Sequence, residues 1–246
     1  MSGHSKWANI KHKKGKADAL RGKITTKIAN EITLAVRMGG ADPTGNMKLK
    51  LALTKAKANN VPKDNINRAI QKGLGGTEGA NWEEVTYEGY GPCGVALMVN
   101  CLTDNRNRTA ADIRHSFTHF GGNLGTTGAV AWMFKRKGSF AIDKEKFPDL
   151  TEDDLMMMVL DAGAEDIKSD DDGFEITCEP DAFEAVLAAL EQNKLECEVA
   201  EITMIPDTLT ALSAEDGAKV QRLLDDLDEL DDVQDVFHNA DLPNEE

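Results

Sequence analysis

Basic side chains crowd the start of the chain, where they could bind the phosphates of a nucleic acid. The first 27 residues contain eight Lys or Arg, two His and a single acid, Asp18. The whole chain of 246 residues has a formal net charge of −15, so its start differs sharply from the rest. A concentrated basic segment on an acidic protein is typical of contact with a polyanion. The candidate contact residues are Lys6, Trp7, Lys11, His12, Lys13, Lys14, Lys16, Arg21, Lys23 and Lys27.

This basic segment also has a plainer interpretation, because lysine clusters are often just a solvated face. Trp7 could stack on a base or anchor the segment by packing. If six to eight phosphates are engaged, log K should fall with log salt at a slope of roughly −5 to −7. Such contacts position a protein on nucleic acid but do not read its sequence.

A second candidate site lies at Arg106 and Arg108, with Arg114 further along the same predicted helix. The first two stand at the start of that helix, where the helix dipole favours an anion. They could contact phosphate, or they could cap the helix and pair with acids of the protein itself.

Three other motifs are similar to known ligand-binding sites, but the surrounding sequence argues against each. The glycine-rich run 121–128 lies between a helix and a strand, whereas phosphate loops lie between a strand and a helix, so a flexible connector is favoured. His115 and His119 have the i,i+4 spacing of a helical metal site, but no third ligand is near in sequence. The acidic turn at 170–173 departs from a calcium loop because position 168 is Lys.

The sequence predicts no enzyme and no cofactor. It contains no recognisable nucleophile with a base at the spacing of a known motif, although such sites are assembled in space. A remote alternative places an enzyme site in a cleft between domains, with carboxylates such as Glu83, Glu84 or Glu88. A perturbed carboxylate pair in a deep pocket would support that alternative.

Charge is strongly divided along the chain. Residues 1–76 hold 16 basic and 4 acidic residues, residues 77–137 are balanced, and residues 138–246 hold 6 basic and 33 acidic residues. This division indicates separate modules with separate partners, although solubility alone also explains an acidic end. The four cysteines are scattered, which is typical of buried thiols in a reducing compartment. No apolar run is long enough to span a membrane and no secretory signal is present, so a cytoplasmic protein is expected.

Apolar periodicity predicts three helices in the first part of the chain. Apolar residues recur every three or four positions from Ala17 to Val36, and the pattern ends at Met38-Gly39-Gly40. A second helix is predicted from Met47 to Ala58, and a third from Pro62 to Gly73. Residues 1–80 are therefore expected to form a basic arm and a three-helix domain, with residues 74–81 as a linker.

The rest of the chain predicts two α+β modules. Strands at 85–91, 93–102 and 129–134 and a helix at 103–120 precede a β-α-β-β-α-β pattern over 138–206, the order of a ferredoxin-like fold. Thr151, Asp181 and Ser213 are predicted helix caps. The final helix and strand are too little for a domain, so they are expected to return to the middle one. The predicted fold is multidomain α and α+β: residues 81–137 and 207–246 form a middle domain, and 138–206 a ferredoxin-like domain inserted in it.

Several separated motifs together resemble the YebC/PmpR family. They are MSGHSKWANIKHKKGKADALRGK at the start, NVPKDNINRAIQKG (60–73), YEGYGPCGVALMV (87–99), TDNRNRT (103–109) and GNLGTTGAVAWMF (122–134). The resemblance implies three domains arranged as above and a cytoplasmic regulator of transcription that binds DNA. It also implies nucleic-acid contact for Lys6, Trp7, Lys11, His12, Lys13, Lys14, Lys16, Arg21 and Lys23. A mitochondrial relative is a translational activator, and bacterial relatives have been linked to ribosomes translating proline-rich stretches.

The expected function is therefore a non-enzymatic, nucleic-acid-binding regulator of gene expression, with two alternatives for its partner. In one, the helical domain grips duplex DNA, although no recognition helix after a short glycine turn is evident. In the other, the arm and helices bind ribosomal RNA, for which a flexible basic arm suffices. No membrane partner is expected, and a monomer is favoured.

Overall fold

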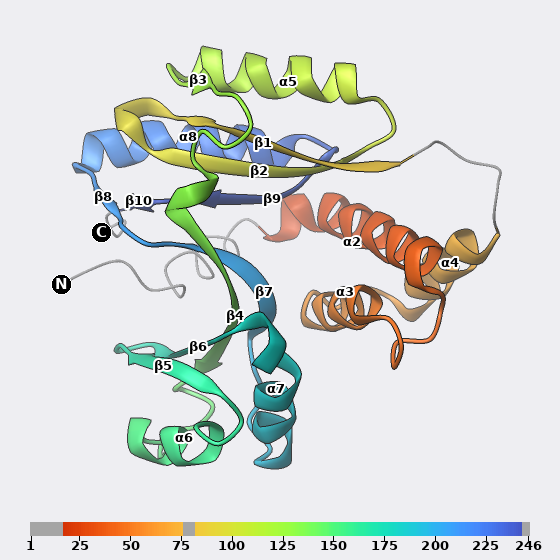
Figure 1. The fold of residues 1–246 in the computed structure, drawn as a ribbon, viewed down its shortest axis with the longest axis vertical. Helices are drawn as coiled ribbons and strands as arrows, with labels where there is room; N and C mark the ends of the chain where they lie inside the picture. The colour runs from red at the N-terminus through yellow and green to blue at the C-terminus, as the bar shows by residue number, and fades with distance from the viewer. Residues whose placement is uncertain (1–16, 76–81, 243–246) are drawn as a thin grey trace. The chain divides into compact units, whose positions relative to one another are not determined.

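The computed structural model describes residues 17–75 and 82–242, with side chains from Gly22 onward. The chain divides into two compact units. One comprises Asp18–Phe134 and the chain from Pro206 onward, and the other comprises Lys135–Ile205 (Figure 1). The three predicted helices, here called the helical segment, fall in the same unit as the predicted middle domain. The predicted domain boundaries at residues 80, 137 and 207 therefore stay a prediction.

The first unit begins with the three predicted helices. They are α2 (Ala17–Gly39), α3 (Met47–Ala58) and α4 (Lys63–Leu74). Their apolar faces form one core, because the residues at three- and four-residue spacing are those that lose contact with water. The buried members are Ile28, Ile32, Ala35, Val36, Leu49, Ala52, Ala56, Val61 and Ala69.

Asn46 fixes the loop between α2 and α3. Its side-chain oxygen accepts a hydrogen bond from the N–H of Leu49 (3.1 Å), which caps α3. Its side-chain nitrogen donates to the carbonyl oxygens of Ala35 (2.7 Å) and Gly40 (2.8 Å). One buried side chain thus satisfies terminal groups of both helices, which would otherwise lack partners.

Helices α2 and α4 approach closely at Gly73. A Cβ atom there would lie 2.7 Å from the Cβ of Val36 and 2.9 Å from the carbonyl oxygen of Thr33. We expect Gly73→Ala to lower the free energy of unfolding by about 1–3 kcal/mol, because the helix backbones must separate. Urea unfolding followed by circular dichroism measures this loss.

Gly22→Ala in α2 is the matched control for Gly73→Ala. No described atom lies within 4 Å of the position that its Cβ would take. Alanine in an open helical position should raise stability by roughly 0.5–1 kcal/mol. Equal stabilities of the two variants would show that α2 and α4 do not pack at Gly73.

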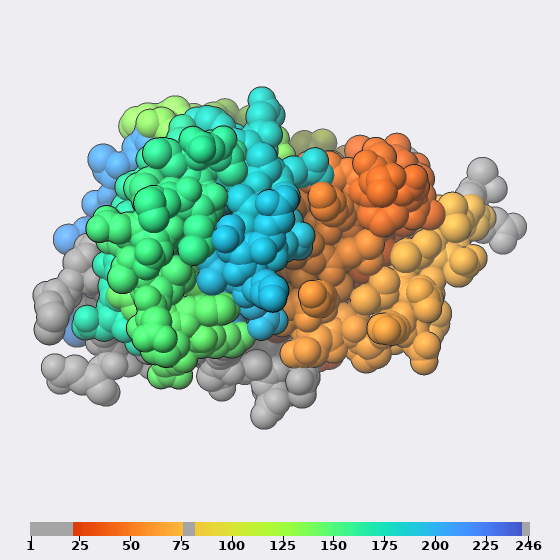
Figure 2. Space-filling view, turned by 90° about the horizontal axis from the view of Figure 1, so that it is seen from below, coloured from red at the N-terminus to blue at the C-terminus, as the bar shows by residue number. Residues whose placement is uncertain are grey.

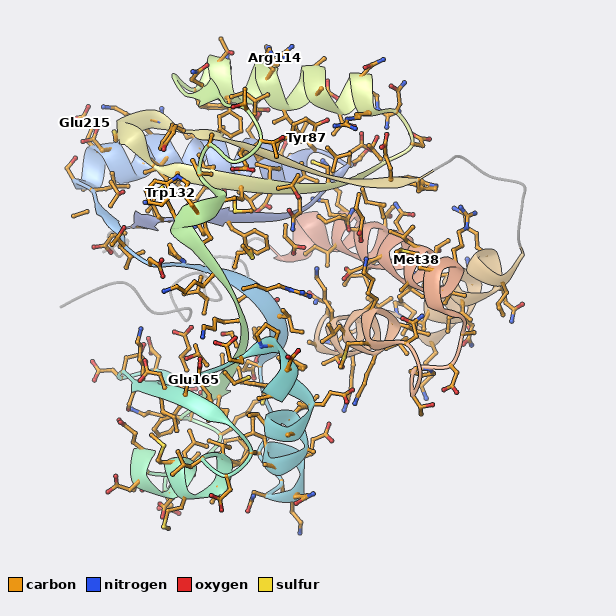
Figure 3. The ribbon with its side chains drawn as sticks, in the orientation of Figure 1. Met38, Tyr87, Arg114, Trp132, Glu165 and Glu215 are labelled. Atoms are coloured by element: carbon orange, nitrogen blue, oxygen red, sulfur yellow. The ribbon has the colours of Figure 1, made fainter. Side chains whose placement is uncertain are left out.

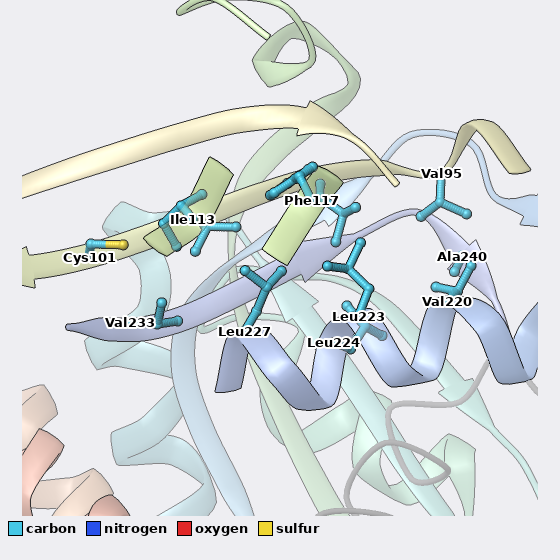
Figure 4. Packing of buried hydrophobic residues seen from close by; sticks show 12 residues of the cluster. Val95, Cys101, Ile113, Phe117, Val220, Leu223, Leu224, Leu227, Val233 and Ala240 are labelled. Atoms are coloured by element: carbon cyan, nitrogen blue, oxygen red, sulfur yellow. The ribbon is translucent and has the colours of Figure 1, made fainter. Parts of the chain in front are cut away.

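The same unit contains a four-stranded antiparallel sheet in the order β3-β1-β2-β9. Helices α5 (Arg106–His119) and α8 (Ala214–Glu229) lie on one face of it. Alternate residues of β2, Leu97, Val99 and Cys101, face these helices and form their common core (Figure 4). The strands are β1 (Glu83–Tyr90), β2 (Ala96–Thr103), β3 (Asn123–Leu124) and β9 (Val233–His238).

The end of the chain completes this sheet. Strand β9 pairs antiparallel with β2, from Leu97 opposite His238 to Cys101 opposite Val233. The prediction that the last helix and strand return to the middle segment is therefore confirmed. A short parallel pair, β8 (Thr210–Ala211) with β10 (Ala240–Asp241), lies beside them.

The strand predicted at residues 129–134 is wrong. This segment forms a turn and a 3-10 helix, η2 (Ala131–Met133), and strand β4 begins only at Phe134 and runs to Asp143. The reason lies in β1, where the buried Glu88 carboxylate accepts hydrogen bonds from the segment's backbone. The donors are the N–H groups of Gly128 (2.8 Å), Val130 (2.9 Å) and Ala131 (2.8 Å). Amides bound to a side chain cannot also serve a strand ladder.

The second unit has the predicted βαββαβ order. Its sheet runs β5-β6-β4-β7, so the four strands stand in the order second, third, first and fourth along the chain, as in a ferredoxin-like fold. Phe140 and Phe183 stack in its core with ring centroids 4.8 Å apart. The remaining elements are α6 (Glu152–Val159), β5 (Ala164–Ser169), β6 (Gly173–Cys178), α7 (Phe183–Gln192) and β7 (Val199–Pro206).

Two of the three predicted helix caps are confirmed. Thr151 and Ser213 each accept a hydrogen bond from the backbone N–H three residues on, at 3.1 Å. The prediction for Asp181 is wrong, because it lies inside a 3-10 turn, η3 (Pro180–Ala182), and α7 begins without a side-chain cap.

The prediction of buried thiols holds for three of the four cysteines. Cys101 and Cys178 are buried and Cys197 is partly buried. Burial raises the pKa of Cys101 and Cys197 to about 12 and that of Cys178 to about 11. Cys93 is exposed, because it occupies the tight turn η1 (Pro92–Gly94) with a φ of 60°.

Candidate nucleic-acid interface

Most of the predicted basic arm lies outside the described residues. This applies to Lys6, Trp7, Lys11, His12, Lys13, Lys14 and Lys16. Arg21 lies in α2, but its side chain is not among those described. The predicted contacts that can be placed are Lys23, Lys27, Arg106 and Arg108.

Lys23 and Lys27 contact the end of helix α8. Lys23 Nζ donates to the carbonyl oxygen of Glu229 (2.8 Å), and Lys27 Nζ donates to that of Asp228 (2.7 Å). These carbonyls belong to the last turn of α8, where the helix has unpaired acceptors and partial negative charge. The two lysines therefore join the helical segment to the middle sheet's helix, which reduces their availability for phosphate.

Arg108 is likewise engaged within the protein. Its guanidinium lies 2.8 Å from a carboxylate oxygen of Asp232 and 3.0 Å from one of Asp104. Its hydrogen bonds to Asp232, and next those to Asp104, raise the pKa of Arg108. Arg106 is more open, with Glu83 at 3.9 Å. The N-terminus of α5 is capped by Asn105, which accepts from the N–H of Arg108 at 3.1 Å.

Two further lysines of the helical segment also pair with the sheet. Lys48 lies 2.9 Å from Glu84 in β1, and Lys55 lies 3.2 Å from Asp235 in β9. Lysines of α2 and α3 thus form contacts within the first unit, which leaves fewer of them available to a nucleic acid.

The outer face of α4 is the surface that the sequence analysis missed. Its exposed polar residues are Lys63, Asp64, Asn67, Arg68, Gln71 and Lys72. They recur at three- and four-residue spacing, so they form one polar stripe opposite the buried Ala69 and Gly73. Among the described residues, no ion pair involves Lys63, Arg68 or Lys72. Figure 2 shows α3 in orange and α4 in yellow-orange on the visible face.

A short turn presents α4 to solvent. Asn59 ends α3, Asn60 takes the left-handed conformation with a φ of 52°, and the N–H of Val61 donates to the carbonyl oxygen of Ala56 (2.9 Å). The carbonyl oxygen of Pro62 then accepts from the N–H groups of Asn65 (2.9 Å) and Ile66 (3.2 Å) in α4. Asn tolerates this conformation better than most residues, so this turn needs no glycine. A helix placed after a short turn in this way is how helix-turn-helix proteins present their recognition helix.

A small hollow lies beside this stripe. It is lined by residues of α2 and α4 and by Trp82: Asn30, Thr33, Leu34, Arg37, Lys72 and Trp82. Within the described residues, the buried Nε of Arg37 has no hydrogen-bond partner. Lys72 adds a second positive charge to the lining of this hollow.

The carboxylates of the remote enzyme alternative have other partners. Glu83 faces Arg106, Glu84 pairs with Lys48, and Glu88 holds the loop at Gly128–Ala131. Burial of Glu88 opposes its ionisation, but the three N–H donors outweigh this and lower its pKa. A lowered pKa is the reverse of what a general acid at neutral pH needs.

The histidine pair lies on the exposed side of α5. His115 and His119 are exposed on α5, with ring centroids 5.7 Å apart. The described part of the chain contains no group of three or more His, Cys, Asp or Glu arranged to hold a metal ion. None of the described helices is long and apolar enough to cross a membrane.

Comparisons with known proteins cover almost the whole chain. Residues 5–76 match the family model for the TACO1/YebC protein N-terminal domain, and residues 82–240 match that for the TACO1/YebC second and third domain. A probable transcriptional regulatory protein of Clostridium acetobutylicum is 56% identical over 98% of both chains. One of Desulforapulum autotrophicum is 54% identical over 100% of this chain and 98% of its own.

A solved structure shares the fold. The crystal structure of Aq1575, a conserved hypothetical protein from Aquifex aeolicus, matches with a TM-score of 0.86 and 44% identity over 98% of each chain. Sequence and fold agree along the full length of both described units. The chain belongs to the TACO1/YebC family.

Proposed function

We propose that this protein is a non-enzymatic regulator of gene expression that binds nucleic acid through the outer face of α4 and the basic arm before α2. The observation that carries this proposal is the exposed stripe of α4, where three cations and two amides lie together with one acid, Asp64. It belongs to a segment with a net charge of +12 in a protein of net charge −15. The names of the relatives, probable transcriptional regulatory proteins, support the same function. Such a regulator would act in the cytoplasm.

The residue types on α4 suit a DNA major groove. Arginine binds guanine through two hydrogen bonds, and asparagine or glutamine binds adenine in the same way. Arg68, Asn67 and Gln71 provide these groups on one face. Lys63 and Lys72 stand at the two ends of the stripe, where they would contact the phosphates. The lysines of residues 6–16 would add phosphate contacts.

The charge of the second unit favours a second candidate, an RNA-binding translation factor. Residues 135–205 contain 20 acidic and 7 basic residues. DNA would repel this unit, whereas a ribosome places basic proteins beside its RNA. The same α4 face and arm would then bind ribosomal RNA.

Co-sedimentation with ribosomes, compared with binding to duplex DNA across a salt series, tests the proposal. Retention on ribosomes at salt that strips the protein from arbitrary DNA supports the translation factor. Salt-resistant binding to selected DNA duplexes supports the transcriptional regulator. Absence of binding to both at low salt contradicts the proposal as a whole.

A further inference from the structure

Trp132 in η2 exposes its ring to solvent instead of packing it. Its relative exposure is 72%, although tryptophan is among the residues that gain most from burial. It lies on the side of strands β1 and β2 opposite α5 (Figure 3). A single exposed apolar residue is not by itself a contact site, so the neighbours of Trp132 decide what it can do.

The ring of Trp132 is held in place by its own loop. Its Nε1–H donates to the carbonyl oxygen of Ala129 (3.2 Å), and the hydroxyl of Tyr90 donates to the same oxygen (3.4 Å). Tyr90 is itself 39% exposed. The polar ends of two aromatic side chains therefore meet at one carbonyl, and the indole N–H has its partner without any ligand.

Glu88 fixes this loop from the sheet. Its carboxylate binds the N–H groups of Gly128, Val130 and Ala131, and its carbonyl oxygen accepts from the N–H of Gly125 (2.8 Å). The loop thus has its hydrogen bonds satisfied before any partner arrives. A rigid contact site loses little conformational entropy on binding.

The sequence around Trp132 carries positive charge, although Asp207 lies beside it, where its N–H donates to the carbonyl oxygen of Met133 (2.9 Å). Residues 113–142 contain no Asp or Glu, in a chain that has 43 of them. Lys135 and Arg136, both exposed, come next in the chain and begin the second unit. A planar base suits the exposed indole of Trp132 better than an aliphatic peptide side chain does, because its ring can stack on the indole.

We propose that Trp132, supported by Tyr90, is a stacking platform for an unpaired base of single-stranded nucleic acid. The proposal rests on the nucleic-acid binding proposed above and adds a second contact, outside the helical segment. Stacking needs a base that is free of its partner strand, so this site discriminates single strands from duplexes without reading sequence.

Tryptophan fluorescence tests the stacking directly. The chain has three Trp, so Trp7→Phe with Trp82→Phe leaves Trp132 as the reporter. Titration with single-stranded RNA, single-stranded DNA and the matched duplex should show saturable quenching by the single strands and little by the duplex. The two single-stranded titrations show which sugar is preferred. Quenching by an apolar peptide but by neither single strand would overturn the proposal.

Trp132→Ala in the otherwise unchanged protein gives the second measurement. We expect a roughly 5- to 100-fold loss of affinity for single strands with an unchanged salt slope, and a smaller loss for Trp132→Phe. Leu209→Ala, another exposed apolar side chain of the same unit, is the control and should bind as the original protein does. Wild-type affinity of Trp132→Ala for single strands contradicts the platform even if duplex binding is normal. If the unsubstituted protein binds neither single strands nor duplex, the proposed function itself is contradicted.

Discussion

Glu88→Gln is expected to lower the free energy of unfolding by about 2–3 kcal/mol, because it turns an acceptor of three hydrogen bonds partly into a donor. The glutamine nitrogen would face N–H groups of the loop at Gly128–Ala131, and at least one buried donor would lose its partner. Only 5% of Glu88 is exposed, so water cannot easily replace the lost acceptor. Thermal or urea unfolding of both proteins measures the difference.

The difference between the two proteins should depend on pH. Burial alone would raise the pKa of Glu88, but the three backbone N–H groups lower it below its ordinary value of 4.5. The unfolded chain then binds the proton more tightly than the folded protein does, so ionised Glu88 stabilises the fold above about pH 4.5. This contribution is lost as the pH falls through the lowered pKa. The stability gap between wild type and Glu88→Gln should therefore be full near neutral pH and shrink in acid.

Glu84→Gln separates this effect from simple loss of a charge. Glu84 lies on the same strand and face, but it is exposed and pairs with Lys48, so its loss should cost less than about 1 kcal/mol. Hydrogen exchange adds a local measurement, since the amides of Gly128, Val130 and Ala131 should lose protection only in Glu88→Gln. Equal stabilities of the two variants, or unchanged exchange at these amides, would contradict the role assigned to Glu88.

The sequence predicts well what depends on neighbours along the chain. The apolar stripe from Ile24 to Val36 identifies α2, and Thr151 and Ser213 identify the starts of α6 and α8. Helix periodicity and caps act within a few residues, so a single sequence contains them. The ferredoxin-like order follows from the same local signals.

Contacts between distant residues explain the errors. Glu88 binds amides about 40 positions away and turns a predicted strand into a loop. Lys23 and Lys27 bind carbonyls about 200 positions away, so nothing near them in the sequence indicates that they are engaged. The face of α4 was open to detection, because Asn67, Arg68, Gln71 and Lys72 recur at helical spacing. Ile66, Ala69 and Ile70 predict the helix, and the polar positions between them indicate which face is exposed.

Neutralising the face of α4 is expected to weaken nucleic-acid binding about tenfold to a hundredfold at low salt. The variant is Lys63→Gln with Arg68→Gln and Lys72→Gln, which keeps good helix formers in α4. If the three side chains each contact a phosphate, the slope of log K against log salt should become shallower by about 3. Fluorescence anisotropy with one labelled duplex and one labelled RNA, over a salt series, measures both quantities.

Three exposed cations elsewhere provide a control with the same change of net charge. Lys168, Lys194 and Arg222 are exposed and lie outside the helical segment. Their replacement by Gln should leave the slope of log K against log salt unchanged. This slope depends on the number of phosphates that the protein contacts and not on its net charge. A similar loss of affinity in this control would mean that the protein responds to overall charge and has no interface on α4.

Replacing the uncharged residues of the same face tests whether α4 recognises base sequence or only binds phosphates. Asn67→Ala with Gln71→Ala removes no charge, so the salt slope should stay the same. If α4 lies in a major groove, each lost bidentate contact removes roughly 1–3 kcal/mol of preference between base pairs. Selection from a random duplex pool would then yield a consensus for the original protein and a weaker one for this variant. If neither protein selects a sequence while the triple variant still loses affinity, α4 is a phosphate-binding face, as expected of a protein that recognises RNA by its shape.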